Sequence, residues 1–168
     1  MGRIPAAGML ALVLLLSACG QGRDLPPADA SFEGTVFHYG DHDYDMSSRN
    51  REVNCILSAV PVGEKIVVIC HSGPKNGIYC IFDTENETFD RDITGNHLIW
   101  HSDDITTAVY SFWSEVRAYD GSVLKTYNLK KDDCIHDLAF SGDYTELDVT
   151  IAYGGGTEET DTIALPGK

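Results

Sequence analysis

Basic residues are scarce in this chain. Its 168 residues include 12 Lys and Arg against 26 Asp and Glu, so the formal net charge is −14. Nucleic acids and anionic lipid headgroups are bound through cationic side chains, so this balance argues against both as partners. The acidity favours solubility and, among ligands, a cationic protein, a cationic peptide or a metal ion.

The sequence also lacks the short motifs of common enzyme classes. It contains no Gly-x-Ser-x-Gly, no His-Glu-x-x-His and no phosphate loop. The run Gly154-Gly155-Gly156 has no following Lys-Ser or Lys-Thr, so it predicts a hairpin turn. We therefore expect a binding or interaction protein of unknown ligand. The alternative is a small cell-envelope hydrolase that uses a carboxylate or histidine near residues 97–104, with Asp103 beside His101.

No apolar run reaches the ~20 residues that a membrane-spanning helix needs. The longest such stretch covers residues 4–16, and Pro5 and Gly8 interrupt it. It follows the short basic start Met1-Gly2-Arg3 and precedes the small residues Ser17-Ala18. A basic start, a short apolar core and small residues at the end are the layout of a secretory signal peptide.

The run Leu16-Ser17-Ala18-Cys19 resembles the lipobox of bacterial lipoproteins. The resemblance covers residues 1–19. It implies that the sulfur of Cys19 takes a diacylglycerol, that residues 1–18 are removed, and that Cys19 becomes the mature N-terminus. An ordinary signal peptide would instead release the protein. We expect a protein held by lipid at the extracytoplasmic face of a cell membrane.

The mature chain divides into a short tether and one domain. Residues 19–30 are rich in Gly, Pro and polar side chains and show no apolar periodicity, which predicts a flexible tether. Residues 31–168 suit a single domain by length.

The domain shows no helical periodicity. Short apolar, β-branched and aromatic runs alternate with turn signals such as Asn-Gly and Asp-Gly, a pattern that predicts antiparallel hairpins and an all-β fold. The expected strands are residues 35–39, 53–60, 65–71, 78–83, 88–92, 97–101, 106–113, 115–119, 123–129, 135–140, 144–153 and 157–165.

The spacing of the expected strands along the sequence predicts a repeat. Strands that open at Val53, His97 and Ile135 stand 44 and 38 residues apart. Repeats of ~40–45 residues with four strands each are typical of β-propeller blades, which the runs Ile78–Asp83 and Val116–Asp120 weakly resemble. Because a closed propeller has at least ~4 blades, three repeats would leave apolar faces for a homodimer or a protein partner to cover. A β-sandwich and a truncated remnant of a longer propeller lipoprotein are the alternatives to a propeller-like stack of about three blades.

Four further cysteines, Cys55, Cys70, Cys80 and Cys134, are candidates for disulfides, which an even number outside the cytoplasm permits. Turns centred near residues 62–63 and 75 would place Cys55 and Cys80 opposite Cys70, which could bond only one of them. Free cysteine also packs as a small apolar core residue. The sequence contains no Cys-x-x-Cys spacing, so it does not predict a zinc site.

One acidic segment has the spacing of a calcium loop. Asp41, Asp43, Asp45 and Glu52 fall at positions one, three, five and twelve of an EF-hand loop. Met46 stands where that loop has glycine, and two arginines add positive charge. The segment is therefore either a Ca²⁺ site or a solvated acidic loop, and we expect no other cofactor.

Both tryptophans, Trp100 and Trp113, stand at the ends of expected strands. Large rigid rings there favour a recognition surface, and packing between sheets is the alternative. His97 and His101 share one face of an expected strand but lie ~13 Å apart along it, at ~3.3 Å per residue, so they cannot share a metal ion unless a bulge intervenes.

Overall fold

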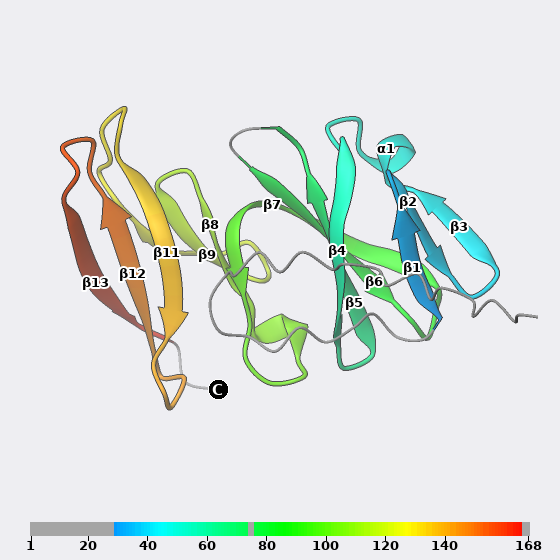
Figure 1. Ribbon diagram of the computed structural model, residues 1–168. Coiled ribbons are helices and arrows are strands. Elements are labelled where there is room, and N and C mark those ends of the chain that lie inside the picture. Colours follow the sequence, from blue (N-terminus) through cyan, green and yellow to red (C-terminus); the bar gives the residue numbers. More distant parts are fainter. Residues whose placement is uncertain (1–28, 74–75, 166–168) are drawn as a thin grey trace, which may run out of the picture.

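A computed structural model describes residues 29–73 and 76–165 (Figure 1). The predicted signal peptide, Cys19 and most of the predicted tether lie outside the described residues. The described residues form strands joined by turns, with one short α-helix, α1 (Met46–Arg49), and one 3₁₀ turn, η1 (Ile105–Thr107). None of their helices is long and apolar enough to cross a bilayer. The prediction of an all-β fold is confirmed.

The strands form three antiparallel sheets. The first contains β1 (Ala30–Glu33), β2 (Val36–Tyr39) and β3 (His42–Asp45). The second has the order β10-β9-β8-β7-β6-β5-β4, with bounds β4 (Cys55–Val62), β5 (Lys65–His71), β6 (Gly77–Asp83), β7 (Thr88–Ile99), β8 (Val109–Phe112), β9 (Glu115–Ala118) and β10 (Val123–Thr126). The third contains β11 (Cys134–Phe140), β12 (Glu146–Ala152) and β13 (Glu158–Ala164).

The long strand β7 joins two halves of the second sheet. Its first part pairs with β6 and its last part with β8, and the register shifts between Asn96 and Ile99. The prediction of two separate strands, residues 88–92 and 97–101, was wrong, because the chain bends between them without leaving the sheet. Gly95 permits the bend: a Cβ at this position would lie 2.5 Å from the carbonyl oxygen of Ser111 on β8.

Three hydrophobic cores separate four layers that stand in a row (Figure 1). The first core packs Phe37 of the first sheet against Phe82 and other residues of β4–β6. The second lies between the two halves of the seven-stranded sheet and includes Ile81 and Tyr110. The third packs β8 and β9 against the β11–β13 sheet and includes Leu147. Each half of the central sheet is therefore buried on both faces.

The two end sheets turn polar faces outward. In the first sheet Ser31, His38 and Asp43 share the face opposite the core, and all are exposed or half-buried. In the third sheet the exposed residues Asp148 and Thr162 pair across the outer face, where the Thr162 hydroxyl donates to the Asp148 carboxylate over 2.8 Å. The expectation that the end layers leave apolar faces uncovered was wrong, because strand alternation directs mostly polar side chains outward there. The described strands form no closed ring.

Candidate functional site

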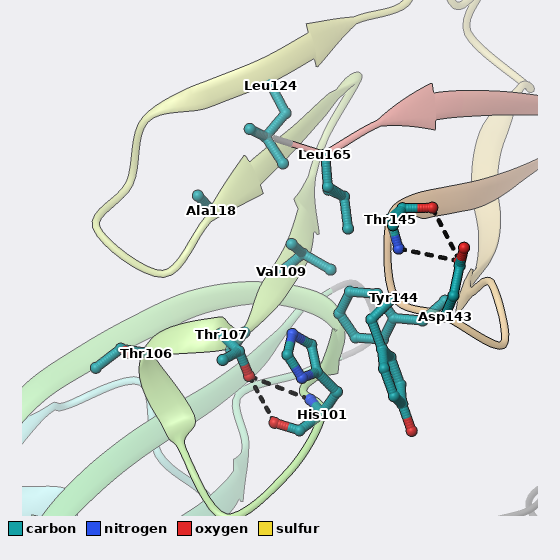
Figure 2. A pocket seen from close by; sticks show the side chains of 12 residues that line it. His101, Thr106, Thr107, Val109, Ala118, Leu124, Asp143, Tyr144, Thr145 and Leu165 are labelled. Atoms are coloured by element: carbon teal, nitrogen blue, oxygen red, sulfur yellow. Dashed lines mark hydrogen bonds between the residues drawn. The ribbon is translucent and has the colours of Figure 1, made fainter. Parts of the chain in front are cut away.

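A pocket of about 480 Å³ opens between the third sheet and the chain around η1. Figure 2 shows that its walls come from the segment after β7, from β8–β10 and from the turn that joins β11 and β12. It is lined by His101, Thr106, Thr107, Ala108, Val109, Ala118, Leu124, Phe140, Asp143, Tyr144, Thr145 and Leu165. Most of these side chains present apolar atoms, which is typical of sites for small molecules.

The backbone of His101 is held by a neighbouring threonine. The Thr107 hydroxyl lies 3.2 Å from the backbone N–H of His101, which donates to it, and 2.8 Å from the carbonyl oxygen of His101. The turn that carries Thr107 begins at Asp104, whose carboxylate accepts from the Thr106 N–H over 2.9 Å. These local bonds present the imidazole to the pocket (Figure 2).

An aromatic cluster closes one side of the pocket. The ring of Tyr144 stacks on His101 with centroids 4.5 Å apart and planes at 23°. Phe140 meets both rings edge-on, at 5.3 Å from His101 and 5.9 Å from Tyr144. Tyr144 is half exposed at 50% and has a φ of 59°, in the left-handed region that bulky residues rarely adopt. Such strain persists only where the surroundings compensate for it, and it clusters at functional sites.

Asp143 is the one acidic residue that lines the pocket among the described residues. Its Oδ1 accepts from the hydroxyls of Ser141 and Thr145, at 2.8 and 2.9 Å, and from the Thr145 N–H at 3.2 Å. These bonds, that from Ser141 foremost, hold the pKa of the Asp143 carboxyl below its usual value. Asp143 is therefore ionised at neutral pH.

The residues of the hydrolase hypothesis do not come together. His101 lines the pocket, but its ring makes no hydrogen bond with Asp103, whose carbonyl instead lies against Gly63. His97 faces the third sheet, and its burial there lowers the pKa of His97. A bulge lies between the histidines and His101 stands beyond the end of β7, so the expected common strand is not formed.

The four residues of the predicted calcium loop are also placed apart. Asp45 caps α1 by accepting from the N–H and hydroxyl of Ser47, at 2.9 and 2.7 Å, and these bonds lower the pKa of Asp45 to about 2. Asp43 instead binds His38 at 2.6 Å, while Asp41 is exposed in the β2–β3 turn and Glu52 lies beyond α1. Among the residues the structure describes, no group of three or more His, Cys, Asp or Glu side chains is arranged to hold a metal ion.

The four cysteines are free thiols in the structure. Cys70 pairs with Ile56 and Ile78 rather than with Cys55 and Cys80. The expected register was wrong because the β4–β5 hairpin turns at Gly63 and Glu64, about one residue later than predicted, and the β5–β6 hairpin is centred about one residue earlier than predicted. Cys70 and Cys80 nevertheless meet diagonally in the first core, where the neighbouring Cys70 thiol, foremost, and burial raise the pKa of Cys80. Cys134 is exposed on the outer face of the third sheet.

The two tryptophans have different surroundings. Trp100 is half-buried and packs against the second core, as the core-packing alternative predicts. Trp113 is 67% exposed in the turn between β8 and β9, with its ring edge-on to Phe112 at 6.3 Å. Neither lines the pocket.

No protein-family model and no curated protein matches the chain. Sequence reasoning missed the aromatic wall of the pocket, because residues 144–153 were expected to form one strand and β12 begins only at Glu146. Tyr144 instead belongs to the turn. A bulky aromatic next to the turn run Ser141-Gly142-Asp143 was the available signal.

Proposed function

We propose that the protein is a lipid-anchored, extracytoplasmic binding protein whose ligand is a small molecule held in the pocket at His101 and Tyr144. The pocket carries the proposal, since its volume of about 480 Å³ falls within the ~300–1,000 Å³ usual for ligand sites. The lipobox-like run that ends at Cys19 supports the location. The absence of a His101–Asp103 pair favours binding over hydrolysis.

The layered body is best described as an open, propeller-like row. Each half of the central sheet uses four antiparallel strands, β4 to β7 and β7 to β10, and both of its faces are buried, as in a propeller blade. The three-stranded end sheets act as caps, as the terminal repeats of stacked proteins do. The row therefore needs no second chain to cover its ends, and the ligand site lies between the last two layers.

The anchor is tested by mass spectrometry of the protein purified from membranes. We expect the mature chain to start at Cys19 and to carry a diacylglycerol and a thioether bond at that residue. A product that retains residues 1–18, or a Cys19 without lipid, would contradict the proposed location. This measurement does not depend on the pocket.

The pocket is tested with indole, a neutral aromatic probe, by isothermal titration calorimetry. The mature protein is placed in phosphatidylcholine nanodiscs, and empty discs are the blank. We expect saturable binding that weakens at least tenfold in two variants: His101→Ala, which removes a stacked ring, and Ala118→Leu, which fills the pocket.

Trp113→Ala is the matched control, because it removes an exposed aromatic ring outside the pocket. It should bind indole as the unaltered protein does. If Trp113→Ala lost indole binding while Ala118→Leu kept it, the binding site would instead lie at the exposed turn between β8 and β9. Absence of saturable binding to the unaltered protein would reject the pocket as a ligand site.

A further inference from the structure

We propose that the pocket selects organic cations, namely molecules that join an apolar ring or chain to an ammonium or guanidinium group. This inference rests on the proposed function, since it names the ligand class of the same site. The apolar part lies against the inner walls and the cationic group lies at the mouth, beside the carboxylate of Asp143.

The inner walls can hold only the apolar part of such a ligand. Val109, Leu124 and Leu165 contribute branched side chains from three different strands or their ends, and Ala118 leaves room between them (Figure 2). An ammonium group placed among these side chains would lose its water without gaining a partner. The charge of a bound cation must therefore remain near the polar rim.

The rim offers one ionised carboxylate with an oxygen to spare. The three hydrogen bonds that Asp143 accepts from Ser141 and Thr145 all end on Oδ1. Its Oδ2 accepts from neither of these residues, so it is open to a ligand donor. The bonds to Oδ1 also fix the carboxylate, which reduces the entropy lost when a cation binds it.

The aromatic rings beside Asp143 also favour a cationic ligand. Tyr144 directly follows Asp143, and its ring with that of Phe140 borders the mouth. The faces of such rings attract cations within ~6 Å of the centroid. A cation at Asp143 is thus placed between a carboxylate and π-electron density.

Charge complementarity extends to the whole molecule. The residues that line the described pocket include no lysine or arginine, so an anionic ligand would find no fixed positive charge there. The formal net charge of −14 raises the local concentration of cations and repels anions. Both effects favour a cationic ligand over an anionic one, as the carboxylate of Asp143 does.

Three probes with one ring system test the charge preference. Indole is neutral, tryptamine is cationic and indole-3-acetate is anionic at pH 7. With the mature protein in phosphatidylcholine nanodiscs at 50 mM salt, we expect tryptamine to bind at least fivefold more tightly than indole, and indole-3-acetate more weakly than indole. The tryptamine advantage should shrink at 500 mM salt, because exposed charges are screened.

Asp143→Asn tests the assigned carboxylate. The amide oxygen can still accept from Ser141 and Thr145, so the turn is kept while the charge is lost. We expect the affinity ratio of tryptamine to indole, both measured on this variant, to fall below twofold. Asp43→Asn, which removes one charge from the first sheet, is the matched control and should keep the full advantage.

The possible failures are distinct. If indole binds and tryptamine binds no more tightly, the cation selectivity is overturned while the proposed function stands. If Asp43→Asn reduces the advantage as much as Asp143→Asn does, the preference comes from net charge and the role of Asp143 is overturned. If no probe binds, the proposed function itself fails.

Discussion

Tyr144 combines a strained backbone with a ring at the mouth of the pocket. Its N–H donates to the Ser141 carbonyl over 3.0 Å, and its φ of 59° is one that asparagine tolerates and most other side chains do not. The neighbouring Gly142 does not occupy this left-handed position. The turn thus places an aromatic residue where a small one would relieve strain.

We predict that Tyr144→Asn and Tyr144→Ala both weaken indole binding at least tenfold, yet differ in stability. Both lose the stacking on His101, but only asparagine relieves the backbone strain. Tyr144→Asn should therefore be more stable than Tyr144→Ala by about 1 kcal/mol, near the lower end of the left-handed penalty. Urea unfolding followed by circular dichroism measures the difference. Equal stability of the two variants would show that the turn stores no strain.

At the scale of the element, strand β7 depends on a residue without a side chain at its bend. We predict that Gly95→Ala destabilises the fold by about 1–3 kcal/mol, the usual cost of overpacking. Its Cβ would lie 2.5 Å from the Ser111 carbonyl oxygen and 2.8 Å from the Tyr110 ring, both of which belong to the packed sheet. Thermal and urea unfolding give the change in free energy.

Gly142→Ala is the control for this substitution. A Cβ at Gly142 would meet nothing within 4 Å, and its φ is not positive. The free energy of unfolding should change by less than about 0.5 kcal/mol, as for most surface substitutions. A comparable loss in both variants would mean that the effect of Gly95→Ala does not come from the close approach of β8.

The hairpin between β6 and β7 depends on an ionised carboxylate. Asp83 accepts from the Lys65 ammonium over 2.6 Å, from the Asn86 amide over 2.9 Å and from two turn N–H groups. These bonds, that from Lys65 foremost, hold the pKa of Asp83 well below its usual value. In the unfolded chain the group titrates near its ordinary pKa of ~3.9.

We predict that this stabilisation is complete above about pH 5 and is lost as the pH falls through and below ~4, because the unfolded chain then takes up a proton that the folded chain does not. Asp83→Asn should lower the melting temperature most at pH 6, and its difference from the unaltered protein should shrink towards pH 2. Calorimetric melts over this range measure it. A difference that stays constant with pH would show that the charge of Asp83 does not stabilise the hairpin.

The strands also show how much of the fold could be predicted from sequence patterns. Strand β5 was predicted with its observed bounds because its run of apolar residues has clear turn signals on both sides. Strands β1 and β3 were missed, since their short polar sequences Ala-Ser-Phe-Glu and His-Asp-Tyr-Asp resemble a tether and an acidic loop. They become strands by pairing with β2, which no local pattern specifies. The pocket was missed for the same reason, because His101 and Tyr144, which build it together, stand 43 positions apart in the sequence.

At the scale of the whole molecule, polarity at both ends of the row is an argument about the oligomeric state. An apolar outer face would demand a partner, but Ser31, His38 and Asp43 cover one end and Asp148 and Thr162 belong to the other. Burying these polar groups against a second copy would cost free energy unless every one found a hydrogen bond. Large single-sign charge adds repulsion between copies.

We predict that the chain from Gly20 onward is a monomer, since the three cores are built from residues 30–163 and do not need the lipid. Light scattering coupled to gel filtration should give the mass of one chain. The paired substitution Asp148→Val with Thr162→Val places two adjacent apolar side chains on the outer face of the third sheet and should promote association at high concentration. A dimer of the unaltered chain would contradict the polar-cap account, because some face other than the two end sheets would then have to hold the copies together.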